Sequence, residues 1–278
     1  MRAGRQVRAL VRTFEGSRSR ERTDWLSGEE PLEVRLATPG GTAKLTVTMR
    51  TPGHDFELVA GLLLAEGVIG GPDDLRRLTY CTDPGADTPG RYNVVSVELR
   101  PGLEPDLAGL GQTFSASSAC GVCGRAGLEA LHGRGLAPLP PGPPVAPRTL
   151  YGLPDALRAA QATFEATGGL HAAALFSPDG RMLCLREDIG RHNAVDKVLG
   201  WALLEHRPVG ETVMLVSGRA GYEIVQKAVV ARVPVLCSVS APSSLAVALA
   251  VEFGLTLVGF LRGERMNVYA GFERVAAG

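Results

Sequence analysis

Residues 213–221 read Val-Met-Leu-Val-Ser-Gly-Arg-Ala-Gly, four apolar residues followed directly by a turn of small and polar ones. The apolar run predicts a short buried strand, and glycine at 218 and 221 allows a tight turn before the next element. The same order of apolar strand, polar turn and helical pattern recurs after residues 186 and 237. This alternation of strands and helices predicts an α/β fold for the C-terminal half of the chain.

Arginines occur at these same turns. Arg191, Arg219, Arg262 and Arg265 each lie just past a predicted strand, and His192 follows Arg191. The carboxyl ends of parallel strands meet at one edge of a sheet, where helix N-termini also present free N–H groups that suit phosphate. A single turn of this kind is an ordinary α/β connection, but several together favour an anionic ligand bound by guanidinium groups. His192 could be a proton donor, a phosphate ligand or only a helix-start residue.

Two adjacent carboxylates, Glu187 and Asp188, precede this turn. They could pair with Arg186 and Arg191 as a solvated salt network, which the sequence favours over a role in general acid chemistry.

The N-terminal half carries a different pattern. Residues 32–36, 45–49 and 92–99 alternate apolar and polar side chains, which predicts strands with one buried face. Apolar residues from 56 to 63 have helical spacing, and Gly67 suits a left-handed helix end. These patterns predict a mainly antiparallel β domain with one helix, so that the chain as a whole is α+β.

The first 22 residues contain seven arginines. Such a segment is compatible with a transit peptide or an anion-binding arm. The interpretation that the sequence favours is a solvated edge strand that turns Val7, Ala9 and Val11 inward.

Six prolines lie between residues 133 and 148, a composition that suits neither a helix interior nor a central strand. We therefore predict a domain boundary there. The expected parts are an N-terminal β-rich domain of residues 1–132, a Pro/Gly-rich linker of residues 133–148 and a C-terminal α/β domain of residues 149–278.

Charge and hydropathy exclude several classes of protein. The 278 residues contain 29 Lys plus Arg and 29 Asp plus Glu, a balance that argues against a dedicated nucleic-acid binder. No apolar run is long enough to span a membrane, and the N-terminus lacks the apolar core of a secretory signal. Five cysteines, an odd number with one close pair, argue against a secreted disulfide framework. We therefore expect a reduced, cytoplasmic protein without a membrane partner.

The close pair of cysteines is Cys120 and Cys123, in a Gly-rich loop. This spacing occurs in dithiol redox centres and in half of many zinc sites. No second pair completes a zinc site, and the His-x-Glu and Pro-Cys-x-x-Cys elements of zinc deaminases are absent, so no metal is expected. Arg125 or a helix N-terminus would favour the thiolate that nucleophilic or sulfur-carrying chemistry requires.

Six segments together resemble the FdhD family, the accessory sulfurtransferases of formate dehydrogenase. They are Thr-Pro-Gly-His-Asp at 51–55, Cys-Gly-Val-Cys-Gly at 120–124, the run from Arg186 to Lys197, Ser-Gly-Arg at 217–219, Ser-Ala-Pro-Ser-Ser at 240–244, and Gly-Phe-Leu-Arg-Gly-Glu-Arg-Met-Asn-Val-Tyr at 259–269. A lone Cys-x-x-Cys would be a weak signal, whereas this combination spans most of the chain.

The resemblance implies a protein that takes persulfide sulfur from a cysteine desulfurase and passes it to the molybdenum cofactor of formate dehydrogenase. Cys120 matches the persulfide-carrying position, and Cys123 is the second thiol of the motif. The segment Phe260, Leu261, Arg262, Gly263, Glu264 and Arg265 matches the part that binds Mo-bis(molybdopterin guanine dinucleotide), and Ser217, Arg219 and His192 are expected nearby. The family also implies a cytidine-deaminase-like C-terminal domain and a homodimer.

Two other functions remain open on the residues alone. Cys120 and Cys123 could form the redox pair of a thiol-disulfide oxidoreductase. Alternatively, the chain could be a non-catalytic chaperone that escorts the cofactor, with both thiols incidental.

Overall fold

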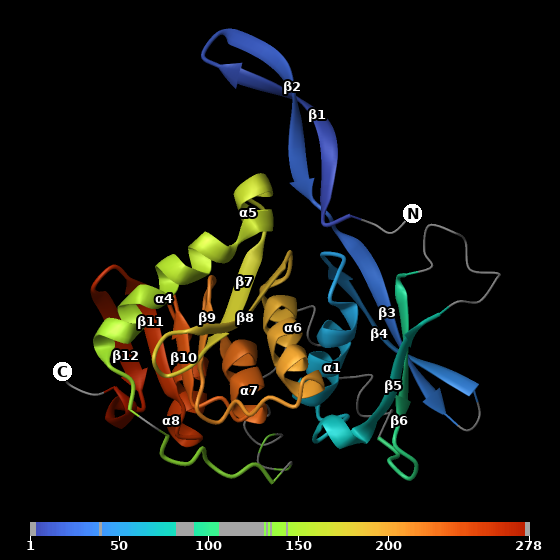
Figure 1. Cartoon of the computed structure of the whole chain (residues 1–278), viewed down its shortest axis with the longest axis vertical. Coiled ribbons are helices and arrows are strands. Elements are labelled where there is room, and N and C mark those ends of the chain that lie inside the picture. The colour runs from blue at the N-terminus through green and yellow to red at the C-terminus, as the bar shows by residue number, and fades with distance from the viewer. Residues whose placement is uncertain are drawn as a thin grey trace.

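A computed structural model describes residues 4–38, 41–81, 92–105, 131, 133, 135–142 and 144–275. The molecule has an N-terminal part built on a four-stranded sheet, a larger C-terminal part built on a six-stranded sheet, and a two-stranded arm that projects from one end (Figure 1). These sheets and their helices confirm the predicted mixed α/β class.

The N-terminal sheet has the strand order β4-β3-β6-β5, with β3 and β6 parallel and the other pairs antiparallel. Apolar side chains at alternate positions of β3 point to one face and pack against the helix, so the period-two pattern is confirmed. The helix ends as the sequence predicted, with Gly67 in the left-handed region. The elements are β3 (Glu30–Thr38), β4 (Gly41–Arg50), α1 (Asp55–Glu66), η1 (Pro72–Asp74), β5 (Leu75–Tyr80) and β6 (Val94–Leu99).

The arginine-rich N-terminus forms an antiparallel hairpin of β1 (Gln6–Glu15) and β2 (Arg18–Ser27), here called the arm. The expectation that Val7 turns inward on an edge strand was wrong, because its side chain is exposed. The strand period was correct, but β1 pairs only with β2 and joins neither larger sheet. A local pattern shows that a strand has two faces, not whether anything covers either of them.

The C-terminal sheet has the order β12-β11-β10-β9-β7-β8, in which β9, β10 and β11 are parallel. Helix α4 packs on one face, and α6, α7 and α8 cover the other, so the central strands are buried on both sides. The elements are α4 (Pro147–Ala160), α5 (Ala162–Thr167), β7 (His171–Phe176), β8 (Met182–Asp188), α6 (Arg191–Leu204), β9 (Val213–Val216), α7 (Tyr222–Val230), β10 (Val235–Ser238), α8 (Ser244–Glu252), β11 (Thr256–Arg262), β12 (Arg265–Ala270) and η3 (Phe272–Arg274).

The two parts meet where α1 packs directly on α6. Two glycines allow this close approach. A Cβ added at Gly61 would lie 1.9 Å from the carbonyl oxygen of Asp196, and one added at Gly200 would lie 1.8 Å from that of Glu57. Any larger residue at either position would force the helices apart.

The proline-rich stretch runs along the C-terminal part and is fixed to it by hydrogen bonds. The guanidinium of Arg232 donates to the carbonyls of Ala137 and Pro138, and that of Arg274 donates to Pro140. Helix α4 begins at Pro147, where the ring's fixed φ and missing N–H suit the first helical position. No helix in the described residues is long and apolar enough to cross a membrane.

Candidate functional site

The carboxyl ends of β9, β10 and β11 and the turns that follow them form one continuous surface, here called the carboxyl edge (residues 217–220, 239–243 and 259–265). The Ser238 hydroxyl donates to the Gly218 carbonyl over 2.7 Å and accepts from the Ser240 amide over 3.1 Å. The Phe260 amide then donates to the Ser240 carbonyl over 3.1 Å. The segments 217–219 and 260–265, which the sequence analysis placed together, are therefore linked through Ser240.

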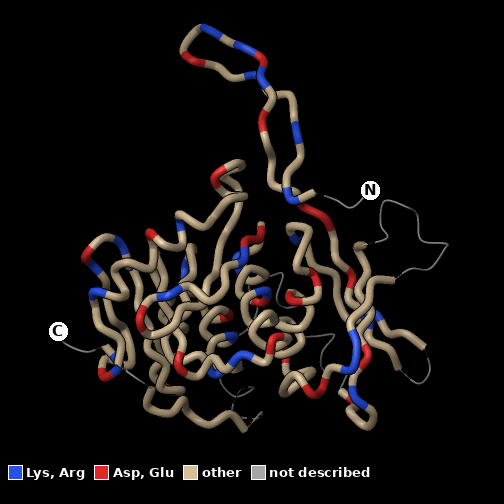
Figure 2. The backbone as a smooth tube through the Cα atoms, viewed as in Figure 1, with Lys and Arg blue, Asp and Glu red and all other residues tan. Residues whose placement is uncertain are grey.

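Four arginines stand at or beside this edge. Arg191, Arg219, Arg262 and Arg265 are exposed, and none makes an ion pair with a carboxylate among the described residues. Arg262 instead lies over the Phe260 ring, 5.8 Å from its centre. Figure 2 shows the charged positions on the turn between β11 and β12. Guanidinium groups without carboxylate partners retain all their hydrogen-bond donors for an anionic ligand.

Two histidines lie at the β7 end of the edge. A Cβ on Gly218 would be 3.5 Å from Nδ1 of His171 and 3.9 Å from Cβ of Arg191, so these residues are neighbours. Burial lowers the pKa of His171, and the positive charges of Arg191 and His192 lower that pKa further. The nearby charge of Arg191 is thus the second cause of this lowered pKa, after burial.

His192 is oriented by a carboxylate. Its Nε2 lies 2.8 Å from Oε2 of Glu223, the second residue of α7. This hydrogen bond lowers the pKa of Glu223 below its ordinary value of 4.5. The contact ties the start of α6 to the start of α7, a role that does not require His192 to touch a ligand.

Two other predicted site residues have side chains engaged in the fold. The Ser217 hydroxyl accepts a hydrogen bond from the Ala172 amide over 2.9 Å, which joins β9 to β7. Leu261 is fully buried in the core between α4 and the sheet. Phe260, by contrast, is partly exposed with φ at 53°, a conformation uncommon for a residue with a side chain.

Cys120 and Cys123 lie outside the described residues. Among the described cysteines, Cys184 and Cys237 are buried and Cys81 is partly exposed. Burial raises the pKa of Cys184 to about 12 and also raises that of Cys237. These two thiols are therefore protonated at neutral pH and are poor nucleophiles. The described residues contain no group of three His, Cys, Asp or Glu side chains placed to hold a metal ion.

The run from Arg186 to Lys197 has a structural role that sequence reasoning missed. Adjacent charges in this run suggested a solvated network of Asp188 with Arg186 and Arg191, yet Asp188 is completely buried. Its carboxylate lies 2.6 Å from Nζ of Lys197 and accepts from the Thr51 amide over 3.1 Å. Lys197 also donates to the Thr51 carbonyl over 2.8 Å. These bonds fix the N-terminal part to the helix that presents Arg191 and His192.

Residues 50–57 supply further paired charges close to the contact between the two parts. Buried Arg50 donates two hydrogen bonds to buried Asp55, at 3.0 and 3.2 Å, and Tyr80 donates to the same carboxylate over 3.1 Å. Nearby, Glu57 forms a bidentate pair with Arg186 across the two parts, at 2.5 and 2.7 Å. The contact between the two parts therefore contains buried and half-buried paired charges, and removal of one partner of a buried pair is strongly destabilising.

The neighbouring carboxylate, Glu187, is a helix cap. Its two oxygens accept hydrogen bonds from the amides of Thr163 and Phe164 at the start of α5, over 3.0 and 2.7 Å. Both carboxylate oxygens of Glu187 therefore have a structural role at the start of α5.

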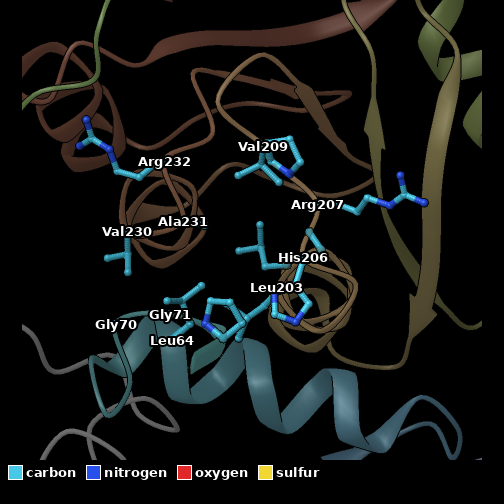
Figure 3. A pocket seen from close by; sticks show the side chains of 14 residues that line it. Leu64, Gly70, Gly71, Leu203, His206, Arg207, Val209, Val230, Ala231 and Arg232 are labelled. Atoms are coloured by element: carbon cyan, nitrogen blue, oxygen red, sulfur yellow. The ribbon is translucent and has the colours of Figure 1, made fainter. Parts of the chain in front are cut away.

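A cavity of about 390 Å³ lies at the other end of the sheet, between α1, α6 and α7. Its lining is mainly apolar, and Figure 3 shows the heads of Arg207 and Arg232 pointing away from it. Arg232 is already bound to the proline-rich stretch. This cavity lies near the amino ends of β9 and β10 and lacks convergent cations, so it does not suit a phosphate-bearing ligand.

The fold defines a mixed α/β protein with several exposed arginines at one edge of its larger sheet, and comparisons with known proteins identify its family. The FdhD/NarQ family model matches residues 28–276. The chain is 52% identical to the sulfur carrier protein FdhD of Streptomyces coelicolor over 97% of this chain and 95% of the relative. It is also 52% identical to the protein of that name from Mycobacterium tuberculosis, over 91% of this chain and 92% of the relative. This chain therefore belongs to the FdhD/NarQ family.

A solved structure shows the same fold. A protein from Desulfotalea psychrophila, described as a formate dehydrogenase accessory protein, superposes with a TM-score of 0.76 over 98% of this chain and 99% of that one, at 24% identity. The whole architecture, including both sheets, is thus shared at low sequence identity.

Proposed function

We propose that this chain carries sulfur from a cysteine desulfurase to the Mo-bis(molybdopterin guanine dinucleotide) cofactor of formate dehydrogenase. Relatives named as sulfur carriers and a structural neighbour described as a formate dehydrogenase accessory protein support this role. The single observation that carries the proposal is the carboxyl edge, where four exposed arginines without carboxylate partners among the described residues surround one surface.

The chemistry of this edge fits the cofactor as a substrate. Pyrophosphate groups need several charge-assisted donors, which Arg219, Arg262 and Arg265 can provide. The Phe260 ring offers an apolar surface beside these charges. Leu261 is buried in the core and thereby holds the backbone of residues 260–265 in place.

We assign the role of nucleophile in the sulfur transfer to Cys120. Its thiolate attacks the outer sulfur of the desulfurase persulfide, the donor's S–S bond breaks, and the donor cysteine leaves as a thiolate. Release of this sulfur as sulfide needs two electrons. An attack of Cys123 on the inner sulfur supplies them and leaves a Cys120–Cys123 disulfide, which a cellular dithiol must then reduce.

Mass spectrometry tests the sulfur step. After incubation with desulfurase and cysteine, the peptide that contains Cys120 should gain one sulfur atom, which a Cys120→Ser variant should not acquire and a Cys123→Ser variant should retain. No added sulfur on the wild type would refute the carrier role. A wild type that gains no sulfur but shows a two-electron dithiol potential would favour the oxidoreductase, and maturation that survives both replacements would favour the chaperone.

Calorimetry with guanosine diphosphate tests the binding surface. Arg262→Glu and Arg265→Glu should each weaken binding at least about tenfold, because each removes a charge-assisted contact. Arg77→Glu, at an exposed position of β5, is the matched control and should leave the affinity unchanged. Equal affinity in all three variants would remove the carboxyl edge from the proposal.

A further inference from the structure

The arm is held at its base. The Gly28 amide donates to the Arg5 carbonyl over 2.8 Å, and the Ser27 and Thr167 hydroxyls lie 2.8 Å apart, which joins the arm to α5. Ten residue pairs connect β1 and β2, so the arm extends for about 30 Å at roughly 3.3 Å per residue. Its tip stands clear of both sheets (Figure 1).

The pairing of the strands gives the arm one face with three large apolar side chains. Leu10, Phe14 and Trp25 lie on the same face, because Trp25 pairs with Arg8 and side chains alternate along each strand. Leu10 is 73% exposed, Phe14 69% and Trp25 38%. A two-stranded hairpin is marginally stable in water by itself, so this face would gain stability from a covering surface.

The arm also carries a surplus of positive charge. Its three carboxylates are each paired with an arginine, in Arg12–Glu21, Arg20–Glu15 and Arg22–Asp24. Two further arginines of the arm make no ion pair with a described residue, and one of them, Arg8, stacks over Trp25 at 4.7 Å. Figure 2 shows these charges distributed along its length. Arginine and tryptophan beside exposed apolar residues are typical of protein–protein contact sites.

The base of the arm lies beside the carboxyl edge. Thr167, which contacts Ser27, precedes His171 by four residues, and His171 neighbours Gly218 of the edge. A protein that approaches the edge would therefore meet the arm. The family model begins at residue 28, so the arm is an addition to the part of the fold that this model describes.

We propose that the arm docks on an acidic, apolar-bearing surface of the apoenzyme that receives the cofactor, the client formate dehydrogenase. This inference rests on the proposed function, because it requires the client to approach the edge where the cofactor binds. The surplus positive charge favours an acidic partner, and the apolar face favours a protein over a purely polyanionic ligand. The desulfurase is the rival partner for the arm, and the experiment below distinguishes it from the client.

The test measures binding of the full-length chain to purified apo-formate dehydrogenase by biolayer interferometry. A Leu10→Ser/Phe14→Ser double variant should lose about tenfold or more in affinity, since it removes two apolar contacts from the arm. Val251→Ser/Phe272→Ser is the matched control, because these side chains are 64% and 66% exposed on other elements, and it should bind as the wild type does. An Arg8→Glu/Arg12→Glu variant should also weaken binding and reduce its salt dependence.

The outcomes separate the two proposals. If the wild type and the arm variants bind guanosine diphosphate equally well and the arm variants also keep full affinity for the client, the docking inference fails and the proposed function stands. The docking inference also fails if the arm variants lose binding to the desulfurase but keep binding to the client. It fails likewise if the wild type binds RNA or anionic phosphatidylserine vesicles and the arm variants do not. If the wild type binds no guanosine diphosphate, the proposed function is the part that fails.

Discussion

The ammonium nitrogen of Lys197 lies 2.6 Å from a carboxylate oxygen of Asp188, and both side chains are excluded from solvent. The same two residues bond to the backbone of Thr51, 137 and 146 residues earlier in the chain. One buried ion pair therefore fixes the N-terminal part to α6, the helix that carries Arg191 and His192 beside the carboxyl edge.

Breaking this pair should destabilise the whole molecule. Lys197→Met leaves the Asp188 carboxylate buried without its cation, and we expect a loss of about 3–5 kcal/mol in the free energy of unfolding. Urea denaturation at neutral pH measures this loss. Lys44→Met, at an exposed position of β4, should change stability little, so equal effects of the two substitutions would contradict the role of the pair.

Alanine should have opposite effects on stability at two helical glycines, because only one of them lies in the contact between α1 and α6. Gly200→Ala should cost about 3 kcal/mol, because the added methyl group would overlap the Glu57 carbonyl oxygen. Gly152→Ala, in α4 with no atom within 4 Å of the new Cβ, should gain about 0.5–1 kcal/mol. Thermal unfolding of the two variants would disprove the close crossing if both shifted in the same direction.

The Glu57–Arg186 pair predicts a pH dependence of stability. Burial by itself would raise the pKa of Glu57, but the hydrogen bonds from Arg186 and His54 outweigh it and hold that pKa below 4.5. A carboxyl with a lowered pKa contributes stability above its unfolded pKa and loses that contribution as the pH falls through its folded pKa.

Glu57→Gln should therefore destabilise the protein by about 2–3 kcal/mol at pH 7, slightly less than for a fully buried pair. The difference from the wild type should shrink as the pH falls below 4.5. Urea unfolding between pH 7 and pH 3.5 measures it, with the exposed Glu211→Gln as a control. A stability difference that stays constant over this pH range would show that the charge of Glu57 does not cause the destabilisation.

The two buried cysteines should be protected from alkylation as long as the protein is folded. Cys184, with a pKa raised to about 12, and Cys237, which is completely buried, should resist iodoacetamide at pH 8 in the folded protein and react after denaturation. Peptide mapping before and after urea measures this protection. Rapid labelling of Cys237 in the native state would show that β10 is more accessible than its burial implies.

The sequence predicted the secondary structure of each half well because periodic patterns are local. The strands around residues 32–36 and 213–216 lie where the alternation and the apolar run place them. The grouping of Arg219 with Arg262 was also predictable, since parallel strands must end at the same edge.

Other features depend on contacts that no local pattern contains. Asp188 resembled a member of a solvated charge network because Arg186 and Arg191 are its neighbours along the chain. Its actual partners include Thr51, which only the packing of α1 on α6 brings near. The same holds for the arm, whose strand period was visible but whose separation from both sheets was not.

Phe260 holds its backbone in the left-handed region, where glycine would cost roughly 1–2 kcal/mol less. Stability alone would therefore select glycine at this position. Replacing Phe260 by glycine should therefore relieve backbone strain while removing the ring over which Arg262 lies. The segment thus sacrifices some folding stability to present an aromatic side chain beside that arginine.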